Sequence, residues 1–441
     1  MSAMKLVVGL AAALAFAQAQ AQPKAIELEF PSWQIEEPGA GEYWTELIKA
    51  FEASHPNVKI KKQQVPFREY VDKLTVRFAG NNPPDIVHLP TRNYLAFASQ
   101  GWLAPLDEYL AQTDVKATYT KLADEMLYNG KSYGVLMMGY GMMFYYNEKM
   151  LADAKVAVPK TSDELLKAIA ATTDVNAGRF GYGAPTNEHP NVFVEIGTWV
   201  TGEGASLFKG NKYNFTDPAV IRAIDKFRIA VKSAPKGTAS EQARQLFIDG
   251  KIAMIRDGPW VAAQVKKAPD ATRANLKVGM MPFATVPGGT SNSLHMPANL
   301  DPEKKKLVWE FIRMTTTPEW QQKFTLMTSS PAPRRNALSQ AEMAARPELA
   351  LVNRAANEAV NLFPESVPVR ENYNEFAKIF VEAGMKLMNT DRPTADIMKD
   401  LQAEMQKRIP LSACAPLHGP GPSRAASACS PTRCSPPRWS R

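Results

Sequence analysis

The residue types that carry most enzyme chemistry occur in this chain, but they are not spaced in catalytic patterns. The five histidines are scattered singly, and no His-Glu-x-x-His pair of metal ligands occurs. The sequence also lacks the Gly-x-Ser-x-Gly turn of serine hydrolases and the Gly-x4-Gly-Lys-Ser/Thr loop that cradles phosphates. Carboxylates are numerous, so a pair of acids that hydrolyses a glycosidic bond stays open as an alternative. We therefore expect a binding protein without a catalytic residue, a metal site or a cofactor.

Polar side chains in predicted loops and at one strand end could hold a small molecule. A guanidinium pairs with a carboxylate or phosphate through two parallel hydrogen bonds, so Arg92, Arg256 and Arg334 are candidates for anion recognition. The same three side chains could equally be solvated, and anion recognition stays a hypothesis. The other polar candidates for ligand contact are Gln34, Asn93, Glu188 and His295.

The elements that would position these side chains alternate between strand and helix. In chain order the patterns predict a strand (26–30), a helix with an apolar face over 44–51, a strand (58–65), a helix (67–78) and a strand (85–89). This βαβαβ order predicts an open, mostly parallel sheet with helices on both faces. Ligands of such sheets lie beyond the C-terminal ends of the strands, where Trp33 and the predicted loop 90–93 are expected.

Both ends of the chain differ from its body. A basic start, an apolar run (6–16) and a small-x-small segment (17–21) indicate a secretory signal peptide cleaved after Ala21, with no cysteine nearby for a lipid anchor. All three cysteines lie in residues 411–441, a Pro-, Ser-, Ala- and Arg-rich tail that we expect to be disordered. A shifted reading frame or an artefact is the alternative origin of this tail.

The formal net charge of +8 does not indicate a nucleic-acid partner. Lys5 leaves with the signal peptide, and four arginines lie in the tail, which contains no acid. Subtracting these five charges leaves +3 for residues 22–410. Charges of both signs alternate along the predicted helices, as on an ordinary solvated surface.

Several stretches follow one another in an order known from one family. They are an export signal before Trp33, the segment Pro83–Val87, the segment Asn129–Val135 before Phe144–Glu148, Phe247–Trp260 ending in Gly-Pro-Trp, Val308–Ile312 and Ser330–Arg335. Over about residues 24 to 409 the chain resembles the bacterial extracellular solute-binding proteins of family 1, the maltose-binding-protein-like periplasmic components of sugar ABC transporters. Each motif alone is weak, whereas their order and spacing are specific.

The resemblance implies an α/β fold with two lobes, the type II periplasmic binding protein. Each lobe would be a mostly parallel open sheet flanked by helices, with hinge segments crossing between the lobes. One lobe would comprise residues 24–136 with 281–312, and the other residues 137–280 with 313–410. The crossover run 136–143 lacks the proline common there and carries four methionines, which we expect to pack in the core.

The implied function is capture of a carbohydrate or related small solute and its delivery to the membrane permease of an ABC importer. Neutral mono- or oligosaccharides are the first candidates for the ligand, followed by sugar acids, polyols and glycerol-phosphate compounds. We expect a periplasmic monomer that binds no nucleic acid. A periplasmic glycoside hydrolase and a ligand-loaded sensor that docks on a receptor remain the alternatives.

A sugar presents apolar C–H faces ringed by hydroxyls, so its site needs flat aromatic rings beside polar groups. The family motif presents Trp260, and Gly258 with the following proline stiffens its approach. The other aromatic candidates are Trp33, Trp199, Tyr140 and Tyr373. The tryptophans expected to be core or structural instead are Trp44, Trp102, Trp309 and Trp320.

Overall fold

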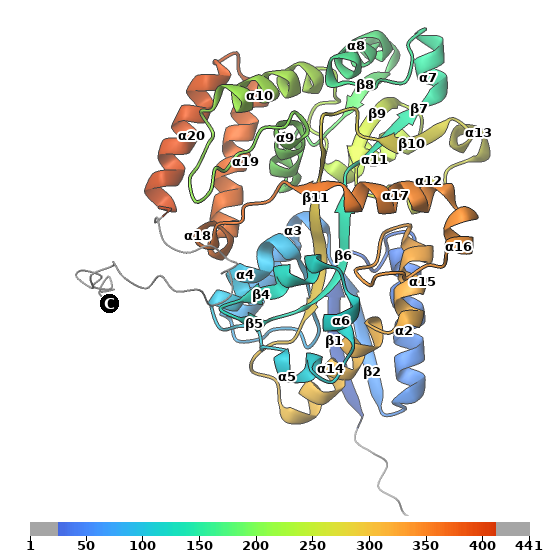
Figure 1. Cartoon of the computed structure of the whole chain (residues 1–441), viewed down its shortest axis with the longest axis vertical. Helices are drawn as coiled ribbons and strands as arrows, with labels where there is room; N and C mark the ends of the chain where they lie inside the picture. The colour runs from blue at the N-terminus through green and yellow to red at the C-terminus, as the bar shows by residue number, and fades with distance from the viewer. Residues whose placement is uncertain (1–24, 412–441) are drawn as a thin grey trace, which may run out of the picture.

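The structure, a computed structural model, describes residues 25–411 as two α/β lobes joined by strands that run from one lobe into the other (Figure 1). The predicted signal peptide and the predicted tail beyond Leu411 lie outside the described residues. Within residues 25–411, no helix is long and apolar enough to cross a membrane.

The first lobe begins with the predicted strand–helix alternation. Its opening elements are β1 (Ile26–Ser32), α2 (Ala40–Ser54), β2 (Val58–Gln64), α3 (Phe67–Ala79) and β3 (Val87–Pro90). β1 and β2 pair in parallel along their whole length, and the amide of Ile86 donates to the carbonyl of Glu29, which sets β3 beside β1. Leu28 and Phe30 on β1 are fully buried against the apolar face of α2. The predicted order of these elements is confirmed.

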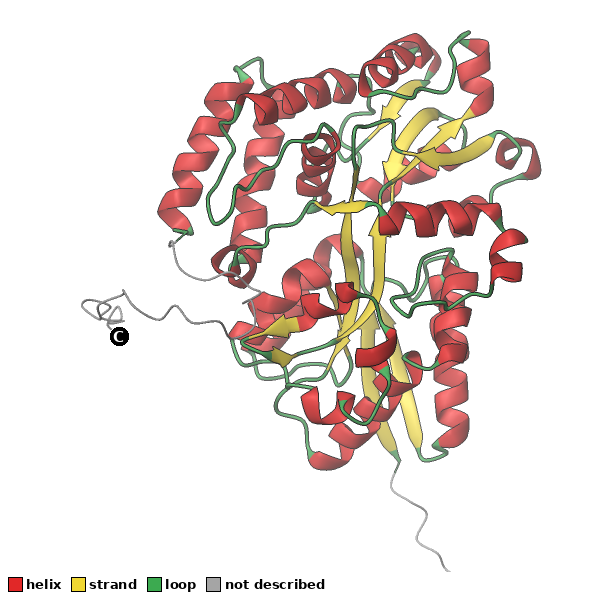
Figure 2. Ribbon diagram, viewed as in Figure 1, coloured by secondary structure: helices red, strands yellow, loops and turns green. Residues whose placement is uncertain are grey.

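The second lobe is built on a four-stranded sheet covered by helices (Figure 2). Its strand order is β10 (Leu276–Met280), β7 (Met143–Asn147), β9 (Ile252–Asp257) and β8 (Phe180–Gly183). The main helices around it are α8 (Ser162–Thr172), α9 (Asn191–Gly202), α10 (Pro218–Val231), α11 (Ser240–Ile248), α19 (Tyr373–Asn389) and α20 (Thr394–Arg408).

Two long strands carry the chain between the lobes (Figure 1). β6 (Val135–Gly141) continues through Met142 into β7 of the second lobe, and β11 (Val286–His295) returns antiparallel to it. β11 then pairs antiparallel with β3, so it forms the centre of the first lobe's sheet. The two-lobed α/β class is therefore confirmed. The sheets are mixed in detail, because β11 runs antiparallel to β3 and β6 but parallel to β12 (Ala359–Asn361), and β7 runs antiparallel to β9 and β10.

The crossover also shows how the methionines pack. Met137, Met138, Met142 and Met143 are each at most 2% exposed, as expected for core side chains. Flexible thioethers fill the irregular space where one sheet ends and the next begins.

The return segment differs from the expected division at residue 313. Helix α15 (Pro318–Thr328) packs on α2 of the first lobe, where Trp320 and Phe324 meet the ring of Tyr43 edge-on. The chain enters the second lobe only after this helix.

The remaining elements complete the two lobes. They are α4 (Thr91–Ser99), α5 (Asp107–Leu110), α6 (Val115–Thr118), η1 (Lys121–Met126), β4 (Leu127–Tyr128), β5 (Lys131–Ser132), α7 (Glu148–Asp153), η2 (Val175–Ala177), α12 (Val261–Val265), α13 (Asp270–Arg273), α14 (Pro302–Thr315), α16 (Gln340–Ala344), α17 (Pro347–Asn357), β12 (Ala359–Asn361) and α18 (Val367–Glu371).

Candidate ligand-binding cleft

A cleft of about 610 Å³ lies where the two lobes face each other. The first lobe contributes the segment after β1 and the start of α4, and the second lobe contributes the starts of α9 and α11 and the segment after β9. The crossing strands β6 and β11 supply Tyr140 and Thr290. The cleft therefore lies beyond strand ends, where sheets of this type bind ligands.

Trp33 follows the last residue of β1 and forms one aromatic wall of the cleft. Its ring stacks on His88 at a centroid distance of 4.2 Å, and Phe67 and Tyr70 meet it edge-on. The Oγ of Ser32 and the Oδ1 of Asn292 hold the two ring nitrogens of His88, at 2.8 and 3.0 Å. Burial lowers the pKa of His88 to about 3, so this supporting imidazole is neutral at physiological pH.

Trp260 forms the opposite wall and comes from the segment that follows β9. Its ring meets that of Tyr140 edge-on at 5.4 Å. A Cβ placed on Gly258 would lie 2.1 Å from the nearest carbon of this indole, so the ring folds back over Gly258 and keeps this position only while residue 258 has no side chain. The hydroxyl of Tyr145 donates to the carbonyl of Gly258 at 3.0 Å and fixes the backbone there.

Most cations around the cleft are neutralised within the protein. Arg256 pairs with Glu195, and both side chains are nearly fully buried. The Nε of Arg244 lies 2.9 Å from a carboxylate oxygen of Asp257. Lys267 of the second lobe reaches Glu42 of the first lobe at 2.6 Å.

An acidic group in the cleft lies close to these pairs. Burial raises the pKa of Glu37 to about 7, with Arg244 opposing the shift and the carboxylates of Asp257 and Glu241 adding to it. The raised pKa brings the change between the accepting carboxylate and the donating carboxylic acid of Glu37 closer to neutral pH. The sequence analysis missed Glu37, Glu241 and Arg244. The one available signal was the position of Glu37 four residues after Trp33.

Arg92 lies between the cleft and a second chamber. It is in the first turn of α4 rather than in the predicted loop, because α4 begins directly after β3. Its guanidinium lies over the rings of Phe67 and Phe363, at 5.5 and 6.0 Å from their centroids. Its Nη2 donates to the Oδ1 of Asn191 across the cleft at 3.2 Å.

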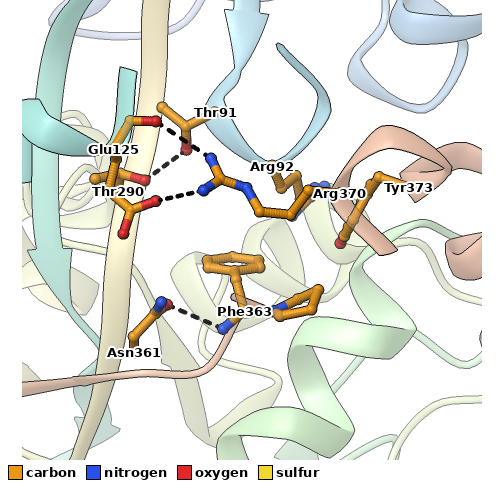
Figure 3. A pocket seen from close by; sticks show the side chains of 9 residues that line it. Thr91, Arg92, Glu125, Thr290, Asn361, Phe363, Arg370 and Tyr373 are labelled. Atoms are coloured by element: carbon orange, nitrogen blue, oxygen red, sulfur yellow. Dashed lines mark hydrogen bonds and ion pairs between the residues drawn. The ribbon is translucent and has the colours of Figure 1, made fainter. Parts of the chain in front are cut away.

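The second chamber has a volume of about 560 Å³ and is continuous with this wall, since Phe67 and Arg92 line both spaces. The predicted residues Asn93, Glu188 and Tyr373 line it as well. The Nδ2 of Asn93 donates to the Oδ1 of Asn374 at 2.8 Å, which ties α4 to α19. A small cavity of about 10 Å³, room for roughly one water molecule, adjoins the chamber, since Arg92 and Tyr373 line both spaces (Figure 3).

Besides Arg256, which lines the cleft, the structure brings together nine of the predicted residues around the cleft and its second chamber. Those whose side chains or backbone lie there are Trp33, Gln34, Arg92, Asn93, Tyr140, Glu188, Gly258, Trp260 and Tyr373. Gln34 also accepts a hydrogen bond from the indole nitrogen of Trp44 at 3.2 Å, so its amide is oriented by the core.

Three predicted residues have other partners. Trp199 is fully buried on α9, and its Nε1 donates to the hydroxyl of Tyr182 at 3.2 Å. His295 ends β11 instead of lying in a loop, and it is held between Ser293 and the carbonyl of Tyr133 at 2.7 Å each. Arg334 pairs with Asp114 at 2.6 and 3.0 Å within the first lobe.

The tryptophans expected to be core are confirmed as such. Trp44, Trp309 and Trp320 are at most 6% exposed. Trp102 stacks on Phe78 at 5.3 Å, as a structural residue would. Across residues 25–411 no group of three or more potential metal ligands is found.

Residues 46–350 match the model of a family described as bacterial extracellular solute-binding protein. The chain belongs to this family. The diacetylchitobiose binding protein DasA of Streptomyces coelicolor is 26% identical over 404 residues, covering 86% of this chain and 89% of that protein.

Two solved structures share the fold. The GacH receptor of Streptomyces glaucescens was solved unliganded and with acarbose. It superposes with a TM-score of 0.76 at 23% sequence identity, and the match covers 87% of this chain and 98% of the GacH chain. An ABC transporter solute-binding protein of Thermotoga lettingae, solved with alpha-D-tagatose, has a TM-score of 0.77 and 20% identity, and covers 87% of this chain and 99% of its own. The two-lobed architecture described above is that of this family.

Proposed function

We propose that this protein captures a carbohydrate between its lobes and delivers it to the permease of an ABC importer. The observation that carries the proposal is the cleft, in which Trp33 and Trp260 face a space surrounded by carboxamide, hydroxyl and charged side chains. Flat rings match the C–H faces of a sugar, and the polar groups match its hydroxyls. The relatives named above bind diacetylchitobiose, acarbose and tagatose, which supports a saccharide as the ligand class.

The crossing strands are the hinge in this proposal. The amide of Met142 donates to the carbonyl of Pro287 at 2.7 Å, so β6 and β11 stay paired where the chain passes between the lobes. Bending of these segments would open the cleft and break the Arg92–Asn191 contact, which links one lobe to the other. Residues 1–21 direct export to the periplasm in this proposal, without a lipid anchor.

The protein binds its ligand without transforming it. The competing function, glycoside hydrolysis, has one supporting observation, since Glu37 with its raised pKa lies near the carboxyl group of Asp257. Asp257, however, is held by Arg244, and its other oxygen accepts from the amide of Gly258 at 2.7 Å. A carboxylate with both oxygens engaged is poorly placed to act as a base or nucleophile.

Calorimetric and thermal-unfolding titrations of the mature chain test the proposal. The panel contains neutral oligosaccharides, monosaccharides, polyols and sugar acids. A ligand present at a hundred times its dissociation constant adds about 2.7 kcal/mol to the free energy of unfolding. We expect saturable binding of one saccharide, which is recovered unchanged after incubation. Product release would favour the hydrolase, and no binding by any saccharide would refute the proposal.

A further inference from the structure

Three helices begin around one point of the second chamber. α4 starts at Thr91, α9 at Asn191 and α19 at Tyr373, and none receives a hydrogen bond from the side chain at its N-cap position. α4 is linked to α9 by the Arg92–Asn191 hydrogen bond and to α19 by the hydrogen bond between Asn93 and Asn374. The first amide of α9 already donates to the Nδ1 of His189, whereas the first turns of α4 and α19 line the chamber and carry the partial positive charge of a helix start. Their convergence creates a positive potential before any side-chain charge is counted.

Arg92 adds a full charge that the protein does not neutralise. Among the described residues no carboxylate forms an ion pair with Arg92, and its one hydrogen-bond partner is the neutral amide of Asn191. The other arginines of the region are matched, since Arg256 pairs with Glu195 and Arg370 with Glu125. The rings of Phe67 and Phe363 hold the guanidinium of Arg92 in place without supplying an anion.

The hydroxyl of Tyr373 is an independent sign of a missing ligand. The side chain is 2% exposed, and its buried hydroxyl has no hydrogen-bond partner. A buried donor without an acceptor destabilises the protein, so such groups are normally paired. Figure 3 shows Arg92, Arg370 and Tyr373 on one side of the small cavity, with the Tyr373 hydroxyl turned toward it. Burial raises the pKa of Tyr373 to about 12, although Arg92 opposes the shift, so the phenol remains a donor at physiological pH.

We propose that Arg92 and the hydroxyl of Tyr373 bind an oxyanion on the ligand, so that the substrate class is an acidic saccharide bearing a carboxylate or a phosphate. This inference rests on the proposed function and narrows it. The guanidinium offers two parallel donors to such a group, and the start of α4 adds amide donors. The nearby carboxylates of Glu125 and Glu375 are held by Arg370 and Arg408. The carboxylate of Glu188 lies exposed at the rim of the chamber.

Titrations with inorganic phosphate, D-glucuronate and glucose 1-phosphate, each against glucose at matched ionic strength, test the anion site directly. We expect at least tenfold tighter binding of one of these anions than of glucose, and loss of that preference in Arg92→Gln. The carboxylate and phosphate arms decide which oxyanion is preferred. Arg222→Gln removes the same charge from an exposed arginine on α10 and serves as the matched control.

Tyr373→Phe separates a ligand contact from a structural role. It removes only the unpaired hydroxyl, so we expect weaker anion binding together with an unchanged or higher melting temperature of the free protein. No preference for any of the three anions, or an equal preference in Arg92→Gln, overturns the inference. Binding of a neutral saccharide without anion preference would leave the proposed function intact, whereas anion binding without any saccharide would overturn the proposed function alone.

Discussion

Replacing Gly258 with alanine should weaken ligand binding while leaving the fold intact. The added methyl group would lie 2.1, 2.2 and 2.4 Å from three carbons of the Trp260 ring. Carbon atoms in favourable contact are about 3.5–4.0 Å apart, so the indole must move by more than about 1 Å. Trp260 is partly exposed in the cleft, so its ring has room to move toward the ligand space.

The expected magnitude follows from the contacts that the displaced ring loses. The edge contact with Tyr140 and a stacked sugar face are each aromatic interactions of about 0.5–1.5 kcal/mol. Loss of the sugar contact lowers affinity by roughly two- to twelve-fold, at about 1.4 kcal/mol per factor of ten. The free energy of unfolding should change little, because alanine restricts the unfolded chain by about 0.4–1 kcal/mol and offsets the lost Tyr140 contact.

The assay is calorimetric titration with the saccharide found in the panel, combined with ligand quenching of tryptophan fluorescence. Gly279→Ala is the matched control, since a Cβ there would meet only one carbon of Tyr146 at 3.9 Å. In a Trp260→Ala background, Gly258→Ala should have no further effect on affinity. Wild-type affinity and quenching in the single Gly258→Ala variant would refute the assignment of Trp260 to the ligand site.

Three further outcomes test the surrounding structure. Glu195→Gln leaves Arg256 buried without its ion-pair partner and should lower the free energy of unfolding in urea by about 3–5 kcal/mol. Arg334→Ala should cost about 1–2 kcal/mol of stability and leave ligand affinity unchanged, since Asp114 is 56% exposed; an affinity change would contradict its structural role. Burial lowers the pKa of His88 to about 3 and that of His295 to about 4, so the unfolded chain binds more protons below pH 6.5. The raised pKa of Glu37 acts in the opposite direction over this range, because the folded protein then binds the proton more tightly. Urea midpoints should therefore fall from pH 7 to pH 5 in a Glu37→Gln variant, each histidine contributing at most about 1.4 kcal/mol per pH unit, and a flat profile of that variant would contradict this.

Local patterns in the sequence predicted the elements of the first lobe and the two aromatic walls of the cleft. Apolar periodicity located β1, α2, β2 and α3, because it follows from which face of each element must be buried. Trp33 was found because a residue after a parallel strand lies at the ligand-binding edge. Trp260 was predicted from a family motif, Gly-Pro-Trp. The glycine of this motif is explained locally, because the indole of Trp260 lies too close to residue 258 for a side chain there.

The predictions that missed the cleft depended on contacts distant in the sequence. Arg334 forms an ion pair with Asp114, which is 220 residues away in the sequence, and no local sequence pattern predicts such a pair. His295 pairs with Val87 of β3, and its ring is fully buried against the ring of Tyr94 and the carbonyl of Tyr133, both distant in the sequence. For Trp199 a local signal existed, since α9 is mostly apolar, with Glu195 as its one charged residue, and every residue from Val192 to Gly202 is buried. A helix whose apolar residues lie on every side is expected to be buried in the core, and a tryptophan on it is then expected to be a core residue as well.

The charges of the cleft also indicate how a ligand would be oriented in it. The carboxylates of Glu37, Glu241 and Asp257 lie together near Arg244, whereas Arg92 lies at the wall shared with the second chamber. The carboxyl of Glu37, with its raised pKa, suits a hydroxyl, because it accepts a hydrogen bond when ionised and can donate one when protonated. An acidic saccharide would then place its oxyanion at Arg92 and its neutral rings between Trp33 and Trp260, since the opposite orientation would bring two negative charges together. The charges that the protein leaves unpaired would therefore determine both the chemical class of the ligand and the direction in which it lies in the cleft.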